Sequence, residues 1–179
     1  MEYCKLQAGC LAVLLYILFS YLREYRTYKR SLRESFFDEL LVLGILCVSF
    51  DCATAYTVNH LDTVNPVLND VLHLLFLTGI DSVVFSVFVY MLHITGLYPR
   101  RLVIKVAGLL PFAVNIFVLV LNFNSLEYVQ GVYTNYSMGF SVYTCFSMVM
   151  LYTLLTVTLF CTRWKYIERH KRSCIIVYV

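Results

Sequence analysis

Residues 71–97 read VLHLLFLTGIDSVVFSVFVYMLHITGL, and this stretch decides the class of the protein. It holds one acidic residue, Asp81, and neither lysine nor arginine. About 20 mostly apolar residues are enough for a helix to cross the hydrocarbon core of a bilayer. The stretch is continuously apolar and does not alternate at period two, so it predicts a spanning helix rather than a barrel strand. Because it is longer than a bilayer requires, we expect it to tilt or to project into water.

Four further runs of the same kind flank this stretch. They cover residues 6–22, 40–58, 102–123 and 140–162. The chain of 179 residues is 60% hydrophobic and only 14% charged, whereas about a quarter of a soluble domain is charged. We therefore expect an all-α, polytopic transmembrane helical bundle with five spanning helices, forming one domain over residues 1–179. A sixth run, 174–179, is too short to span a bilayer and is expected to be a truncated helix.

The basic residues predict how this bundle is inserted. All but one of the 14 lysines and arginines lie in three short segments, which follow the first, third and fifth apolar runs. Short loops that are rich in lysine and arginine stay on the cytoplasmic side of a membrane. We therefore expect a multi-pass protein of the cell membrane with its N-terminus outside. Because five spans leave the chain in the cytoplasm, a sixth and a seventh would precede any further cytoplasmic domain, which suggests a seven-helix module.

The first basic segment has a helical pattern. Aromatic and leucine side chains from Tyr21 to Phe36 recur at spacings of three and four and form one apolar stripe. The basic residues of the segment are Arg23, Arg26, Lys29, Arg30 and Arg33. This arrangement favours either a continuation of the first helix or an amphipathic helix on the anionic inner leaflet of the bilayer. A simple charged connector is the alternative.

Two carboxylates and one amide fall near the middle of the apolar runs: those of Asp51, Asp81 and Asn115. At a rise of about 1.5 Å per residue, each lies about 15 to 20 Å from the start of its run, close to the midplane. An aspartate at a helix centre costs about 2.5 to 3.5 kcal/mol on insertion, so it should face a partner or water. We expect a polar cluster between the second, third and fourth helices that binds an unidentified small ligand, an ion or a proton. The alternative is a hydrogen-bond network that only holds the helices together.

Asp70 and His73 form a second polar group, at the predicted outer mouth of the third helix. Their spacing of three residues places them on one helix face. His60 and Asp62 lie nearby in the sequence, but the spacing of the four residues is too loose to predict a metal site. No phosphate-binding or hydrolase motif is present, so we predict neither a cofactor nor an enzyme activity for this chain. The small net charge of +3 does not favour nucleic acid as a partner.

A resemblance is carried by residues 136–143, which read YSMGFSVY and lead into the fifth apolar run. That run ends in the basic segment from Arg163 to Arg172, before a further apolar stretch. The pattern resembles the N-terminal multi-helix membrane input regions of Gram-positive, mainly clostridial, signalling proteins. In those proteins the membrane region precedes a GGDEF diguanylate cyclase domain or a histidine kinase. The resemblance implies a bacterial sensory module that relays a signal to a cytoplasmic output domain, and a homo-oligomer formed through the full-length protein.

The residues themselves leave a second function open. An ion- or proton-coupled transporter could use Asp51 and Asp81 as its pathway. Such transporters are usually built from internal repeats with paired broken helices. No convincing repeat relates the first three runs to the last two, so the sensory module is our preferred hypothesis.

Overall fold

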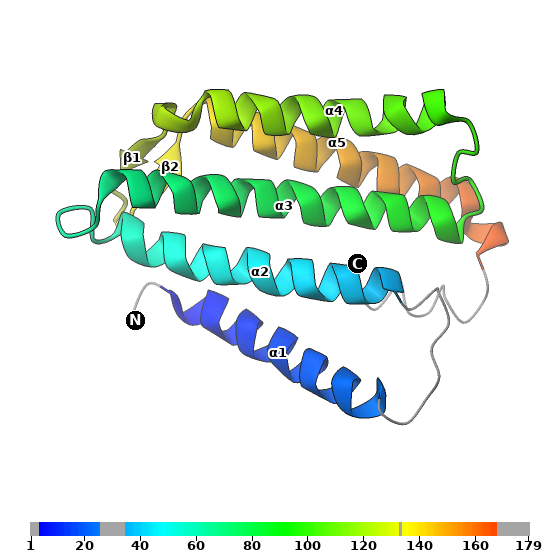
Figure 1. The fold of residues 1–179 in the computed structure, drawn as a ribbon, viewed down its shortest axis with the longest axis horizontal. Coiled ribbons are helices and arrows are strands. Elements are labelled where there is room, and N and C mark those ends of the chain that lie inside the picture. Colours follow the sequence, from blue (N-terminus) through cyan, green and yellow to red (C-terminus); the bar gives the residue numbers. More distant parts are fainter. Residues whose placement is uncertain (1–3, 26–34, 133, 168–179) are drawn as a thin grey trace.

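A computed structural model describes residues 4–25, 35–132 and 134–167 of the chain. Five long helices run alternately in opposite directions: α1 (Lys5–Tyr25), α2 (Ser35–Val58), α3 (Pro66–Ile94), α4 (Leu102–Leu121) and α5 (Phe140–Arg163) (Figure 1). All five are long and apolar enough to cross a membrane. The expected all-α, multi-pass membrane fold is thereby confirmed. The predicted short helix at 174–179 lies outside the described residues.

Two helices begin earlier than the apolar runs suggested. Helix α2 starts at Ser35 instead of residue 40, and α3 starts at Pro66 instead of residue 71. The start of α3 has a local cause, because the Asn65 side chain accepts a hydrogen bond of 2.9 Å from the Val67 N–H. Proline is favoured in the first turn of a helix, where its missing N–H would have no partner. The early start therefore follows from the Asn65-Pro66 pair and not from hydrophobicity.

Helix α3 ends at Ile94, three residues before the end of its apolar run. Gly96 has a φ of 71°, a left-handed conformation that glycine adopts without strain. Its N–H donates to the His93 carbonyl, and the Leu97 N–H donates to the Leu92 carbonyl. These two bonds form a Schellman motif, which satisfies the last carbonyls of the helix and turns the chain toward α4.

The segment between α4 and α5 contains a hairpin that the sequence did not predict. After a short 3₁₀ helix, η2 (Phe123–Ser125), strand β1 (Glu127–Val129) pairs antiparallel with β2 (Tyr136–Met138). The hairpin lies beside the end of α2 and the start of α3, and we call this end of the bundle the hairpin end (Figure 1). A second 3₁₀ helix, η3 (Trp164–Tyr166), follows α5 at the opposite end.

Helix α3 is the centre of the bundle and packs against α2, α4 and α5 (Figure 1). The contact with α2 is close because Gly79 has no side chain, and a β-carbon placed there would lie 3.4 Å from the Cys47 Cα. On its other side α3 contributes Leu77 to the buried apolar core, together with Leu119 of α4 and Val142 of α5. The core of the protein is therefore the α3–α4–α5 interface.

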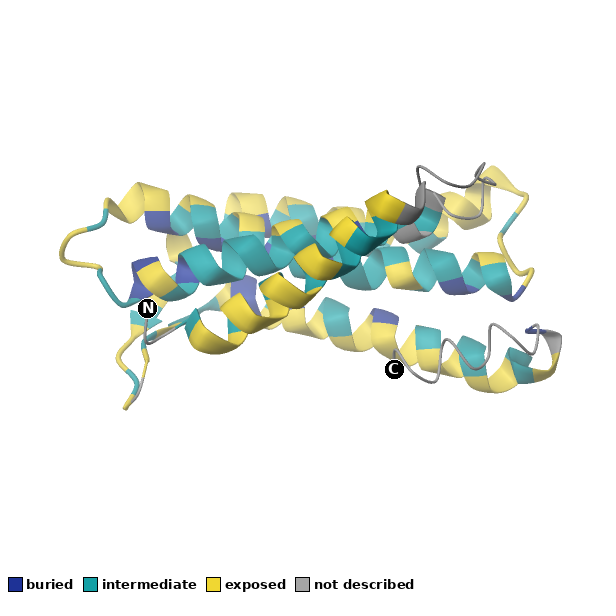
Figure 2. Ribbon diagram, turned by 90° about the horizontal axis from the view of Figure 1, so that it is seen from below, coloured by how far each residue is buried: buried dark blue, intermediate teal, exposed yellow. Residues whose placement is uncertain are grey.

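Helix α1 is attached differently. It packs mainly against α2, which it crosses obliquely, and none of its side chains that the structure describes is buried (Figure 2). Near its far end the Tyr21 hydroxyl donates a hydrogen bond to the Asp38 carboxylate of α2. In a bilayer, the exposed apolar face of such a helix contacts lipid.

The end of the bundle opposite the hairpin carries most of the positive charge, and we call it the basic end. Of the lysines and arginines that the structure describes, all except Lys5 lie there: Arg23, Arg100, Arg101, Lys105, Arg163 and Lys165. The other cations of the first basic segment, Arg26, Lys29, Arg30 and Arg33, lie outside the described residues.

Candidate functional site

Three helices meet at one buried carboxyl group, that of Asp81 in α3. The Asn115 side-chain amide of α4 donates a hydrogen bond to one carboxyl oxygen. The Cys145 thiol of α5 lies 3.4 Å from the other oxygen and donates to it. Asp81 is 2% exposed, Asn115 3% and Cys145 0%. We call these three residues the Asp81 cluster.

Apolar layers enclose the Asp81 cluster along the axis of the bundle. Side chains four residues apart share one face of a helix, and α3 places Leu77 one turn before Asp81 and Phe85 one turn after it. Leu77 belongs to the apolar core that contains Leu119 and Val142. Phe85 stacks on Phe112 of α4 with ring centroids 4.6 Å apart. The cluster therefore lies between two apolar layers, where low polarity strengthens its hydrogen bonds.

A tyrosine of α5 bonds to the backbone of α4 one turn from the cluster. The Phe112 N–H donates to the Tyr152 hydroxyl at 3.2 Å, and that hydroxyl donates to the Gly108 carbonyl at 2.9 Å. These two backbone groups are four residues apart, which is the spacing of a helical hydrogen bond. The hydroxyl thus bonds to both groups next to Pro111, which itself lacks an N–H. Helices α4 and α5 are joined there through backbone atoms of α4.

The second predicted aspartate, Asp51, lies elsewhere. Thr57 pairs with Asn69, and Cys47 with Gly79, across the antiparallel α2–α3 contact. This register places Asp81 level with residue 45 of α2, so Asp51 lies six residues, or about 9 Å, nearer the hairpin end. Its carboxyl group lies beside the Gln7 side chain of α1. Asp81 and Asn115 therefore come together as predicted, whereas Asp51 belongs to the α1–α2 interface.

Tyr128 of the hairpin brings together the other predicted pair, Asp70 and His73. Its hydroxyl donates a hydrogen bond to the Asp70 carboxylate, and its ring meets the His73 ring edge-on at 5.2 Å. Burial and the adjacent Asp70 carboxylate raise the pKa of the Tyr128 hydroxyl. The hydroxyl therefore stays protonated and keeps donating to Asp70 over the physiological pH range.

Two asparagines fix the hairpin to the end of α2. The Asn135 N–H donates to the Asn59 side-chain oxygen at 2.9 Å. The Asn135 side-chain amide donates to the Val58 carbonyl at 3.0 Å, and the Asn59 amide donates to the Thr134 hydroxyl at 2.9 Å. We call β1, β2 and their contacts through Asn59, Asp70, Tyr128 and Asn135 the hairpin cap. This cap connects the α4–α5 segment to both α2 and α3.

A buried amide lies beneath the hairpin cap. Asn69 is fully buried, and its side-chain oxygen accepts a hydrogen bond of 2.6 Å from the Thr57 hydroxyl. Its Nδ2 is the one buried side-chain nitrogen or oxygen that has no hydrogen-bond partner among the described residues. A buried polar group without a partner costs about 1 to 3 kcal/mol, so this position is a weak point in the packing of the hairpin end.

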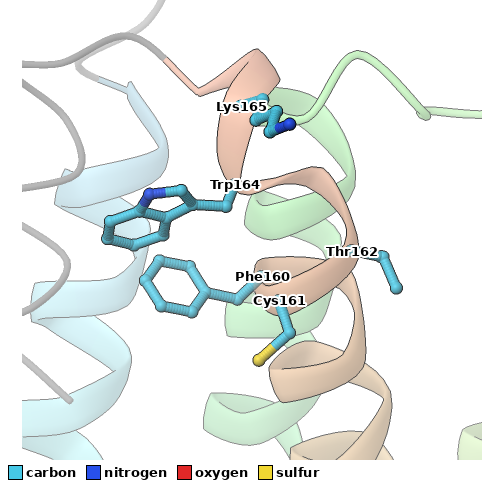
Figure 3. A pocket seen from close by; sticks show the side chains of 5 residues that line it. All are labelled: Phe160, Cys161, Thr162, Trp164 and Lys165. Atoms are coloured by element: carbon cyan, nitrogen blue, oxygen red, sulfur yellow. The ribbon is translucent and has the colours of Figure 1, made fainter.

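The basic end has a depression that the sequence did not indicate. It measures about 610 Å³, is open to the surface and is lined by Phe160, Cys161, Thr162, Trp164 and Lys165 (Figure 3). Phe160 and Trp164 point to one side of α5 and pack edge-on at 4.7 Å, whereas Thr162 points to the other side (Figure 3). Across residues 4–25, 35–132 and 134–167, no three histidine, cysteine or acidic side chains are placed to hold a metal ion.

The sequence analysis did not single out Tyr128, Cys145 and Tyr152. A signal was available for Cys145 and Tyr152, because Val142, Cys145, Val149 and Tyr152 recur on α5 at spacings of three, four and three. Such a repeat marks the face that a helix turns to its neighbours. No comparable signal points to Tyr128, since its role depends on contacts of the hairpin with α3.

Comparisons with protein-family models, with curated proteins and with solved structures found no match to this chain. No relative therefore adds a function to the geometry described above. What can be proposed rests on the Asp81 cluster, the hairpin cap and the two unlike ends of the bundle.

Proposed function

We propose that the chain is a membrane-embedded sensory module that passes a signal from the hairpin end to a cytoplasmic output domain. One observation carries the proposal: the hairpin is joined directly to a spanning helix. Strand β2 ends at Met138 and α5 begins at Phe140. Gly139 between them has a φ of 127°, and a β-carbon there would lie 2.7 Å from the Ser125 carbonyl oxygen. A ligand that shifted the hairpin would therefore shift the first turn of α5.

Helix α5 offers a physical route through the bundle. From the hairpin it passes the Asp81 cluster at Cys145, joins α4 at Tyr152 and ends at Arg163 at the basic end. Hydrogen bonds of this kind are either made or broken, so they support two discrete packings. A ligand that binds one packing more tightly shifts the population toward it. The signal in this proposal is a change in how α5 packs.

The proposed orientation puts the hairpin end outside and the basic end in the cytoplasm. It is supported by the concentration of lysine and arginine at one end, which is typical of cytoplasmic loops. The cations at that end would then face the anionic inner leaflet. Following the resemblance described above, the output domain is proposed to be a diguanylate cyclase or a histidine kinase, with oligomers formed through the full-length protein.

The coupling between the hairpin and α5 can be tested in the chain itself. We expect Asn135→Ala to release the hairpin from α2 and to raise amide hydrogen exchange in residues 140–146 several-fold, in lipid nanodiscs. The matched control is Asn124→Ala, at an exposed asparagine of the same segment. Equal exchange in both variants would show that the hairpin does not govern α5, and the proposal would be withdrawn.

The output domain can be tested in the gene. We expect the reading frame to continue past the Val179 codon, to add two further spans and then to encode a cyclase or kinase domain. In that protein Asn135→Ala should change the output activity and Asn124→Ala should not. A stop codon directly after Val179 would contradict the sensory module.

One observation favours the transporter as a second candidate. Helix α4 contains Pro111, and its backbone bonds to Tyr152 of α5 one turn from the Asp81 cluster. Helices that are broken near a binding site are typical of transporters. The apolar layers on both sides of Asp81 speak against an open path. Proton flux into proteoliposomes under a pH gradient separates the two functions. Flux that disappears in Asp81→Asn would establish the transporter, and its absence in the unmodified protein would exclude proton transport.

A further inference from the structure

Two cysteines lie close together at the α1–α2 interface. The Cys4 thiol, directly before the start of α1, lies 3.4 Å from the Cys52 carbonyl oxygen of α2 and donates a hydrogen bond to it. Neither Cys4 nor Cys52 is buried.

The Cys4 sulfur lies close to the Cys52 backbone. A carbonyl oxygen lies about 2.4 Å from the Cα of its own residue. The Cys4 sulfur is therefore at most about 5.8 Å from the Cys52 Cα. Disulfides join residues whose Cα atoms are about 4.4 to 6.8 Å apart. Bond formation therefore needs a rotation of both side chains and a movement of the loosely packed start of α1 toward α2.

A covalent bond at this position would have a structural effect because α1 is weakly held. None of its described side chains is buried. Gln7 lies beside Asp51 near the hairpin end, and Tyr21 donates a hydrogen bond to Asp38 near the basic end. A bond between Cys4 and Cys52 would fix the first of these ends while the second stays free to separate from α2.

We propose that Cys4 and Cys52 form a redox-active pair whose disulfide locks the start of α1 onto α2. The oxidant is a thiol–disulfide exchange partner, such as a dithiol oxidase or glutathione disulfide. The Cys4 thiolate attacks the disulfide of the oxidant, forms a mixed disulfide and releases one thiol. The Cys52 thiolate then attacks the Cys4 sulfur and releases the second thiol, so two electrons and two protons pass to the oxidant.

The compartment follows from the orientation proposed above. Both cysteines belong to the half of the α1–α2 pair nearest the hairpin end, which that orientation places outside the cell. Disulfides persist outside the cell and are rare in the cytosol. The state of the pair in cells therefore rests on the proposed orientation, whereas its formation in the purified protein does not.

Cys10 is the competing partner for Cys52. It lies six residues after Cys4, about 9 Å further along α1, and it is exposed. The hydrogen bond from Cys4 to the Cys52 backbone places Cys4, and not Cys10, directly against the residue. The structure therefore selects Cys4, and an experiment can separate the two possibilities.

The experiment uses the whole chain, purified with reductant in nanodiscs and then oxidised with glutathione disulfide. After denaturation, free thiols are counted with a polyethylene-glycol maleimide, and peptides are mapped by mass spectrometry. We expect two fewer labelled thiols after oxidation and a cross-linked peptide that joins Cys4 to Cys52. Cys4→Ser and Cys52→Ser should each abolish the loss, whereas Cys10→Ser and Cys161→Ser should leave it unchanged. Circular dichroism verifies that the variants keep their helices.

The consequence for α1 is measured on the same samples. Oxidation should lower amide exchange in residues 5–12 several-fold and leave residues 140–146 of α5 unchanged. A cross-link between Cys10 and Cys52, or an unchanged thiol count after oxidation, would overturn the proposal. Neither of these results bears on the coupling of the hairpin to α5, which is tested with Asn135→Ala, so the two proposals fail separately.

Discussion

The two membrane-embedded aspartates lie in regions of opposite character. Asp81 is 2% exposed and receives hydrogen bonds from α4 and α5 between two apolar layers. Asp51 is only partly buried, and its carboxyl group lies beside Gln7 on a helix that buries none of its described side chains. The same residue type thus holds together a packed interior in one region and faces a loosely bound helix in the other.

This difference shows that the surroundings of a membrane-embedded aspartate, and not the residue type alone, determine what it does. When a hydrogen-bond partner is removed from a closed site, the remaining charge or dipole has no other group to bond to. At an interface that is partly open, water or a neighbouring side chain can take over the bond. We therefore expect stability to respond far more strongly to changes around Asp81 than to changes around Asp51.

The largest effect is expected from Asn115→Leu. It removes the amide donor and leaves the buried Asp81 carboxyl group with the weak thiol donor of Cys145 alone. The free energy of unfolding in mixed micelles, measured by SDS titration, should fall by about 2 to 3 kcal/mol. The double variant Asp81→Leu with Asn115→Leu should recover most of this loss, since no polar group is then left unpaired. Val114→Leu, at the exposed neighbouring residue, is the control. A double variant that is less stable than Asn115→Leu would contradict the proposed difference between the two aspartate regions.

The next effect is expected from Tyr152→Phe. The ring still packs against Phe85, but the hydroxyl that links the Phe112 N–H to the Gly108 carbonyl is lost. We expect a loss of about 1 to 2 kcal/mol and faster exchange of the Phe112 amide hydrogen. Tyr143→Phe, at a side chain that is 59% exposed on the same helix, should cost almost nothing. Identical exchange in the two variants would mean that the Tyr152 hydroxyl does not protect the Phe112 amide hydrogen from exchange.

A smaller effect with a distinct pH dependence is expected from Tyr128→Phe. The raised pKa means that Tyr128 keeps its proton in the folded protein after an unfolded tyrosine, with a pKa of about 10, has lost it. Its contribution to stability is therefore complete below about pH 10 and is lost as the pH rises further. We expect Tyr128→Phe to cost about 1 kcal/mol at pH 7 and less at pH 11. A cost that stays constant between these pH values would show that the hydroxyl makes no buried bond to Asp70.

The smallest effect is expected from Gln7→Leu. It removes the amide that lies beside Asp51, but this aspartate is at an open interface where water can take the place of the amide. We expect the free energy of unfolding to change by about 0.5 kcal/mol or less. A loss as large as that of Asn115→Leu would show that the two regions do not differ in the way proposed. Glutamine to alanine at the same position serves as the control for lost packing.

Much of the fold could be predicted because each span must contain its own apolar run. The five helices follow from that requirement alone, and the Asn65-Pro66 pair would have given the start of α3 correctly. The hairpin could not be predicted, since strands of three residues are stabilised by contacts with Asn59 and Asp70 far away in the sequence. The β-strand propensity of the local sequence does not reveal those distant contacts.

The candidate site was predictable in part. An aspartate in the middle of a spanning helix is costly to insert, so Asp81 was expected to have a partner. Asn115 was a reasonable candidate because it lies at a similar depth. The difference in depth between Asp81 and Asp51 was not predictable, because an error of five residues in a helix boundary moves a residue by about 7.5 Å. A cysteine inside an apolar run has the pattern of a small apolar residue, and only the packing of α5 shows that the Cys145 thiol points at a carboxyl group.

The order of synthesis gives the Asp81 cluster a further consequence. Asn115 follows Asp81 by 34 residues and Cys145 follows it by 64. At about 5 to 20 residues per second, a ribosome delivers Asn115 about 2 to 7 s after Asp81. During that interval neither α4 nor α5 provides a polar partner for the Asp81 carboxyl group of α3. If α3 stays in the insertion machinery during this time, its carboxyl group does not contact lipid. Translation speed between these codons is thus a determinant of how efficiently the protein is assembled.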